Sequence, residues 1–219
     1  ITSISKQNPI NAPMFCMVLR KHLSGGRIVK IEQHKLDRII KIYVECYDEL
    51  GSLSNKIIFC EIMGRRSNIT LVNEKDGTVV DSIRHLTSDM SSYRELLPGI
   101  KYKYPPSQDK LEPLDFDMKD FLLRLNGCSK DARLGKFIGS SFDGISLFAA
   151  KEICHNAGFN ENTEVSSIDD ISIEKLTDSL CAFIKKVSGS DFHPCIYYDG
   201  KEAYDFYSLP LDYLNHMDL

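Results

Sequence analysis

The sequence lacks the patterns by which metalloenzymes, secreted proteins and membrane proteins are recognised. Its seven cysteines include no CxxC pair, and its six histidines show neither HxxxH nor HExxH spacing, so nothing indicates a zinc site. No apolar run approaches about 18 residues, and no signal-peptide core is present. Unclustered cysteines in an odd number favour free thiols in a reducing compartment. We therefore expect a cytoplasmic protein that uses no metal, no other cofactor and no membrane.

Charge is distributed unevenly along the chain. Residues 1–110 contain 17 Lys and Arg against 12 Asp and Glu, whereas residues 111–219 contain 10 against 19. The first acidic side chain is Glu32, and five cationic side chains precede it. A basic first half predicts a surface that faces phosphate groups, although two separately solvated surfaces would give the same counts.

Short alternating and apolar runs predict a β-rich first domain over residues 1–113. Pro13 stands where a helix can begin without a backbone N–H, and Gly25-Gly26 end that helix. The strand candidates, which are separated by turn residues, are 27–33, 38–46, 56–63, 69–72 and 78–83. They predict an antiparallel meander of about five strands after one helix, with residues 109–113 as the linker.

Beyond residue 113 the apolar period changes from two residues to about 3.6, which is typical of helices. The helix candidates are 121–125, 130–138, 147–156 and 173–187, and a closing hairpin joins 195–198 to 203–207. The fold class is therefore α+β, with a mostly helical second domain, 114–219, that ends in a β-hairpin. We expect the aromatic stripe of that hairpin to pack inside it, namely Tyr197, Tyr198, Tyr204, Phe206 and Tyr207.

Polar and basic residues gather where the strands of the first domain turn into loops. This pattern favours the binding of an anionic polymer over catalysis. The candidates are Arg20, Lys21, Asp37, Arg38, Glu61, Arg65, Arg66 and Arg84, together with the apolar Ile62 and Met63 that follow Glu61 in EIMGRRSN. In EIMGRRSN, Gly64 permits a tight bend after which Arg65 and Arg66 face outwards, beside Ser67 and Asn68 as further phosphate or 2′-OH contacts.

Each of these clusters also has a purely structural explanation. Asp37 is equally explained as a turn residue, and Arg38 as a solvated residue at the start of a strand. Arg65 and Arg66 are equally explained as two solvated charges beside a bulge. Arg20 and Lys21 close the first helix, where cations offset the helix dipole whatever they bind.

Four segments in fixed order closely resemble the N-terminal region of the NFACT family. They are PMFCMVLRKHLSGGRIVKIEQHKLDRI, EIMGRRSNITLVN, SSYRELLPG and YPPSQDKLEP, and the similarity covers most of residues 11–113 and, more loosely, 114–219. The resemblance implies a β-rich domain similar to that of formamidopyrimidine-DNA glycosylases, followed by a helix-hairpin-helix-type domain. It also implies that this chain begins inside the first domain and ends before a coiled coil and an RNA-binding domain.

The same resemblance implies a role in ribosome-associated quality control. Family members bind a large ribosomal subunit with a stalled nascent chain, recruit alanyl-tRNA and promote a C-terminal alanine tail. The family's tRNA-handling Asp-Arg pair falls on Asp37 and Arg38, and ribosome or RNA contact is expected at the remaining candidates. Arg66 stands at the family's usual His, which keeps positive charge but removes an imidazole. Tailing itself is not expected from this chain alone.

Within the second domain, residues 140–158 resemble the hairpin and second helix of a helix-hairpin-helix unit. Gly144 and the first amides of the following helix are able to hold a phosphate, but the acidic neighbours Asp143 and Glu152 favour a scaffold role.

Two rival functions remain at this stage. The glycosylase-like fold suggests base excision, but fold does not imply function, and the resemblance places the catalytic groups of those enzymes outside this chain. We therefore expect no enzyme activity. The family's older name suggests a fibronectin-binding surface adhesin. Ribosome and tRNA binding should fall steeply with salt because phosphate contacts release counterions, whereas an apolar adhesin contact should not.

Overall fold

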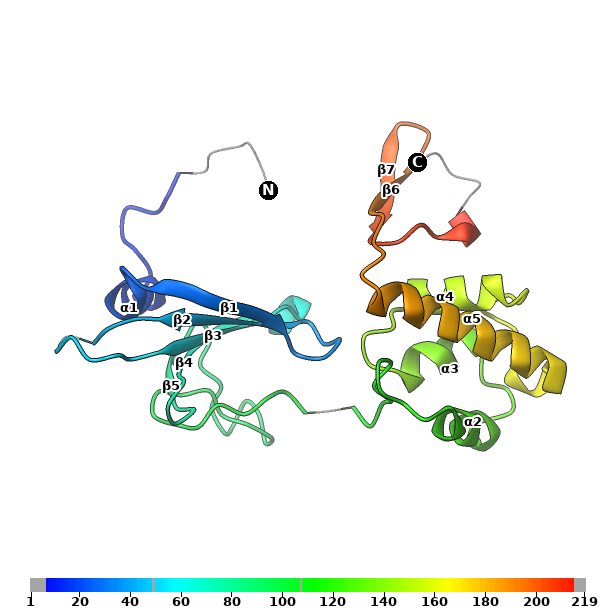
Figure 1. Ribbon diagram of the computed structural model, residues 1–219, viewed down its shortest axis with the longest axis horizontal. Coiled ribbons are helices and arrows are strands. Elements are labelled where there is room, and N and C mark those ends of the chain that lie inside the picture. Colours follow the sequence, from blue (N-terminus) through cyan, green and yellow to red (C-terminus); the bar gives the residue numbers. More distant parts are fainter. Residues whose placement is uncertain (1–6, 49, 107, 215–219) are drawn as a thin grey trace. The chain divides into compact units, whose positions relative to one another are not determined.

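The computed structural model describes residues 7–48, 50–106 and 108–214, and the chain forms two compact units, Ile1–Ser107 (unit 1) and Gln108–Leu219 (unit 2) (Figure 1). Unit 1 is β-rich and unit 2 is helical with a closing hairpin, which confirms the predicted α+β class. The residues expected as a linker lie in unit 2, because the Leu111 amide donates to the Ser141 carbonyl and the Asp143 amide to the Leu111 carbonyl.

In its described residues, 7–48 and 50–106, unit 1 has one α-helix followed by a five-stranded sheet. Each strand pairs antiparallel with the next one along the chain, so the predicted meander is confirmed. The elements are α1 (Met14–Leu23), β1 (Arg27–Gln33), β2 (Ile39–Glu45), β3 (Lys56–Glu61), β4 (Asn68–Asn73) and β5 (Val79–Ser82).

Antiparallel pairing in chain order brings three connections to the same end of the sheet. Gln33 pairs with Ile40, and Ile39 pairs with Glu61, which in turn pairs with Asn68. The β1–β2 turn, the β3–β4 turn and the exit from β5 therefore lie together. We call this the Arg38 end, and α1 leads into β1 at the opposite end (Figure 1).

One face of the sheet is covered by the irregular segment that follows β5. The buried cluster on this face comprises Ile39, Phe59, Val72, Val79 and Leu96. Tyr102 stacks on Phe59 with 3.9 Å between ring centroids, and Leu96 is fully buried. This segment brings residues far from the strands in sequence against the Arg38 end.

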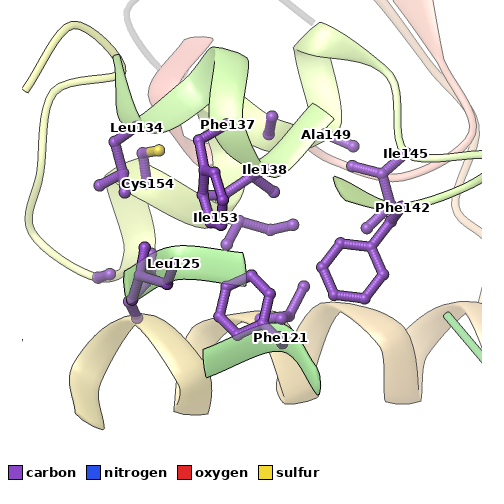
Figure 2. Packing of buried hydrophobic residues seen from close by; sticks show 14 of the residues in the cluster. Phe121, Leu125, Leu134, Phe137, Ile138, Phe142, Ile145, Ala149, Ile153 and Cys154 are labelled. Atoms are coloured by element: carbon purple, nitrogen blue, oxygen red, sulfur yellow. The ribbon is translucent and has the colours of Figure 1, made fainter. Parts of the chain in front are cut away.

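Within its described residues, 108–214, unit 2 contains four α-helices, two short 3₁₀ turns and the hairpin. Their bounds are α2 (Met118–Gly127), α3 (Leu134–Ser141), α4 (Leu147–Asn156), η2 (Val165–Ser167), α5 (Asp170–Ser188), β6 (Cys195–Asp199), β7 (Glu202–Tyr207) and η3 (Asp212–Leu214). Phe121, Ile138, Phe142 and Ile153 meet in its apolar core (Figure 2). Burial in this core also raises the pKa of Cys154 to about 12, and all seven cysteines are free.

The third helix begins later than its sequence predicts. Residues 130–133 precede α3 because the Val165 amide donates to the Ala132 carbonyl and Arg133 forms a β-bridge with Glu164. These tertiary bonds hold extended backbone where local propensity alone favours helix.

The aromatic stripe of the hairpin is divided between its two faces. Tyr197 is 1% exposed and packs on Leu211 and Leu214, as expected. Tyr204 and Phe206 are exposed, so for them the expected packing is wrong. A two-stranded sheet has two faces, and among the described residues of unit 2 it is the Tyr197 face that is covered.

Candidate nucleic-acid interface

The two motifs singled out in the first domain are joined by a backbone hydrogen bond. The Ile62 amide donates to the Arg38 carbonyl oxygen at 2.8 Å, one step beyond the last pair of the β2–β3 ladder. The Asp37-Arg38 turn and the Glu61–Asn68 loop are therefore neighbours at the Arg38 end. Neither motif by itself indicates that they meet.

The β1–β2 turn fixes the backbone from which Arg38 projects. The Asp37 amide donates to the His34 carbonyl at 3.0 Å, and Gln33 Nε2 donates to the Asp37 carbonyl at 2.8 Å. One Asp37 carboxylate oxygen, Oδ1, accepts from the Arg38 amide at 2.7 Å. Asp37 thus has the structural role of a turn residue, and the Arg38 side chain is exposed.

A short 3₁₀ turn, η1 (Gly64–Arg66), presents the next two arginines. Gly64 has φ +58°, a left-handed conformation that a residue with a Cβ adopts only with strain. The Met63 amide donates to Ser67 Oγ at 3.0 Å and closes the loop. Arg65 and Arg66 are exposed.

Asn68 attaches a third arginine to this loop. Its Oδ1 accepts from the Arg84 amide at 3.0 Å, and its Nδ2 donates to the Arg84 carbonyl at 2.9 Å. Arg84 Nη1 then donates to the Arg65 carbonyl at 2.6 Å, which places the two arginines side by side. Asn68 and Ser67, expected as RNA contacts, are instead used within the protein.

The exposed guanidinium groups of the Arg38 end are not neutralised by carboxylates. The arginine–carboxylate ion pairs within the described part of the chain involve Arg27, Arg94, Arg124 and Arg133. None of the described carboxylates pairs with the four arginines that we call the arginine cluster, Arg38, Arg65, Arg66 and Arg84. Such a group attracts anions, and each planar guanidinium suits a phosphate.

Glu61 differs from its expected role because it is buried. Arg94 Nη1 and Nη2 donate to the two Glu61 carboxylate oxygens at 2.8 and 2.5 Å, and the Tyr102 hydroxyl donates at 2.8 Å. The Glu61 side chain is 0% exposed and that of Arg94 is 8% exposed. Burial, reinforced by the Glu61 charge, raises the pKa of Tyr102 and keeps its hydroxyl a donor. A direct RNA contact does not fit this position; Glu61 anchors the loop.

Ile62 and Met63 follow Glu61 in opposite environments. Ile62 is 53% exposed beside Arg38, whereas Met63 packs against the buried cluster of unit 1. Of the two, Ile62 is the residue available to a partner at the Arg38 end.

Arg20 and Lys21 are not brought to the Arg38 end. They lie in the last turn of α1, and the Gly26 amide donates to the Leu23 carbonyl at 2.9 Å immediately before β1 begins. That start of β1 is the end at which Arg27 pairs with Glu45. Their position fits the helix-dipole explanation, and RNA contact by them stays a prediction.

The described residues contain neither a metal-binding cluster nor a membrane-spanning helix. No group of three or more His, Cys, Asp or Glu side chains is placed to hold a metal ion there. Within the same residues, no helix is both long and apolar enough to cross a bilayer.

The chain matches a family model described as NFACT N-terminal and middle domains over residues 1–218. It is 40% identical to the Rqc2 homolog RqcH of Bacillus subtilis (strain 168) over 215 residues, 98% of this chain and 35% of the relative. The archaeal Rqc2 homolog aRqcH of Methanocaldococcus jannaschii is 30% identical over 178 residues, 78% of this chain and 24% of the relative. The chain thus spans about a third or less of the length of these curated relatives.

Solved structures with the same fold include a fibronectin/fibrinogen-binding protein and a fibrinogen binding protein. The N-terminal part of the fibronectin/fibrinogen-binding protein from Streptococcus suis has a TM-score of 0.73 and 26% identity, and the match covers 96% of this chain and 69% of that one. The fibrinogen binding protein from Staphylococcus aureus has a TM-score of 0.70 and 28% identity, with 94% and 70% covered.

Proposed function

This chain belongs to the family of NFACT N-terminal and middle domains, and from that premise we propose that it is the RNA- and ribosome-binding part of a ribosome-associated quality control factor. In this proposal it binds the large ribosomal subunit and tRNA, and it supports C-terminal alanine tailing of stalled nascent chains by a longer protein. It works in the cytoplasm and performs no bond-making or bond-breaking step of its own.

The observation that carries the proposal is the hydrogen bond from the Ile62 amide to the Arg38 carbonyl. It joins the turn that resembles the family's tRNA-handling pair to the loop that presents Arg65 and Arg66. The two sequence motifs are thereby neighbours at one end of the sheet, where exposed arginines of both are available to the same partner.

The chemistry of this surface suits RNA. Guanidinium groups bind phosphates and the edges of unpaired bases, and most contacts to a nucleic acid are made to phosphate and sugar. The arginine cluster supplies such groups without competing carboxylates. Asp37 keeps an acceptor beside Arg38, and a carboxylate in that place is able to accept from a base amino group.

The proposal is tested by binding of the full-length protein to purified large ribosomal subunits and tRNA. Arg38→Ala should release tRNA while the protein continues to sediment with the subunit, because one exposed cation is removed and no internal hydrogen bond of its side chain is lost. Lys75→Ala is the matched control, since Lys75 is an exposed cation in the β4–β5 turn, at the opposite end of the sheet. Equal tRNA retention by wild type and Arg38→Ala, both folded, would remove Arg38 from the tRNA site.

A second candidate function is fibronectin or fibrinogen binding, which is favoured by the structural similarity to a fibronectin/fibrinogen-binding protein and a fibrinogen binding protein. Immobilised fibronectin distinguishes the two. A contact that survives high salt and is unchanged by Arg38→Ala would support the adhesin function, whereas tRNA and ribosome binding should weaken as salt rises.

A further inference from the structure

The β6–β7 hairpin carries an apolar patch on the face that does not pack on unit 2. Ile196 and Phe206 are directly opposite one another in the two strands and are 49% and 77% exposed. Tyr204, two residues before Phe206 on β7, is 59% exposed. We call these three residues the hairpin patch. Figure 1 shows the hairpin projecting beyond the helices of unit 2.

The hairpin is positioned firmly from its other face. Tyr197 is buried against Leu211 and Leu214, and its hydroxyl accepts from the Leu211 amide. Tyr207 lies close to Ser146 at the start of α4, with 3.3 Å between the two hydroxyl oxygens. The hairpin patch is therefore presented on a supported sheet and does not contribute to the core of unit 2.

Charge around the hairpin patch identifies the kind of partner. Residues 189–214 contain five acidic side chains and a single Lys or Arg, Lys201. By strand alternation Glu202 lies on the same face of β7 as Tyr204 and Phe206, and Asp199 pairs with Glu202 at the end of the strands, whereas Asp205 pairs with Tyr197 and lies on the other face. Exposed aromatic rings also bind unpaired bases, but such surfaces combine them with cations that hold the phosphates. An acidic rim repels phosphates and attracts a basic protein surface.

We propose that the hairpin patch docks on a basic protein of the large ribosomal subunit that offers an apolar depression between Lys or Arg side chains. This rests on the proposed function. It adds a protein contact made by unit 2 to the RNA contact proposed for unit 1. Phe206, the most exposed ring, is the anchor, because aromatic anchors surrounded by a polar rim carry much of the affinity of protein interfaces.

Site-specific photocrosslinking tests this contact. The full-length protein with p-benzoylphenylalanine in place of Phe206 is bound to purified large subunits and irradiated, and the adduct is digested with protease or ribonuclease. We expect an adduct with a ribosomal protein that resists ribonuclease. The same photoreactive residue at Leu123, which is 69% exposed on α2, should give no such adduct.

The affinity of the full-length protein for the large subunit provides a second readout. Phe206→Ala should weaken binding about tenfold or more, and Leu123→Ala should leave it unchanged. Three outcomes would overturn the docking proposal and leave the proposed function standing. They are an adduct with RNA, an adduct within the chain, and no adduct in a complex that still sediments. Failure of the wild-type protein to sediment with the subunit would overturn the proposed function together with it.

Discussion

At the residue scale, the pairing of Glu61 with Arg94 determines how the Arg38 end is held. The two residues are 33 positions apart, and both side chains are removed from water. Arg94 Nη1 also donates to the Lys103 carbonyl at 2.9 Å, so the pair ties β3 to the segment that covers the sheet. Ile62, which bonds to Arg38, follows Glu61 directly.

Arg94→Met should lower the free energy of unfolding by about 3–5 kcal/mol, because it leaves the Glu61 carboxylate buried without its cation. Chemical denaturation followed by circular dichroism measures this change. The double variant Glu61→Leu/Arg94→Met removes both charges and should recover much of the loss. A cost below about 1 kcal/mol for Arg94→Met would show that Glu61 reaches water, contrary to its burial.

A second residue-scale prediction concerns acid stability. Hydrogen bonds from Lys30, Lys41 and Tyr43 lower the pKa of Glu32 to about 2 from an ordinary value near 4.5. The unfolded chain therefore binds this proton more readily than the folded chain does. The stabilisation is fully present above about pH 4.5 and is lost as the pH falls towards 2.

Glu32→Gln should abolish this part of the acid sensitivity, since an amide does not titrate. The melting temperature of wild type and variant, measured from pH 6 to the acid limit of folding, should differ most at the higher pH and converge at the lower. Parallel curves over the whole range would contradict the assignment. Asp89→Asn, in the segment that follows β5, is a control for the loss of one exposed carboxylate.

At the scale of elements, η1 depends on a left-handed residue. Gly64→Ala should cost about 1–2 kcal/mol from backbone strain, because a Cβ at this position meets no neighbour within 4 Å and only φ +58° opposes it. Gly64→Asn should cost less, since asparagine tolerates this conformation better. Urea denaturation distinguishes the two variants, and equal stability of Gly64→Ala and wild type would contradict the geometry of η1.

Elements with a strong local pattern are the ones that the sequence predicts well. Alternation over 27–33 corresponds to β1, and the turn residues 74–77 correspond to the β4–β5 connection. The start of α3 is not predictable in this way, because bonds from Val165 and Glu164, more than 30 residues along the chain, hold the preceding residues extended.

The candidate site is predictable only in part, for a related reason. Exposed charges such as Arg38 and Arg65 stand out in the sequence, because they lie at the ends of strand candidates. The burial of Glu61 does not, because its partner Arg94 comes from an irregular segment with no pairing signal. The sequence does not predict the exposure of Phe206. Alternation assigns the residues of a hairpin to two faces, but it does not identify which face is buried.

At the scale of the whole molecule, the two units present opposite kinds of surface. Unit 1 offers the arginine cluster at the Arg38 end, and unit 2 offers an apolar hairpin patch within an acidic rim. The uneven charge of the sequence therefore corresponds to two different proposed partners, RNA for the first unit and a basic protein for the second.

RNA binding by the Arg38 end is tested most directly by the salt dependence of tRNA affinity. The full-length wild type, Arg38→Ala, Arg38→Ala/Arg65→Ala and the control Lys75→Ala are titrated with tRNA at several salt concentrations. We predict that the slope of log K against log salt decreases in magnitude by about one for each arginine removed and is unchanged in the control. Identical slopes in wild type and both arginine variants would contradict phosphate binding at the Arg38 end.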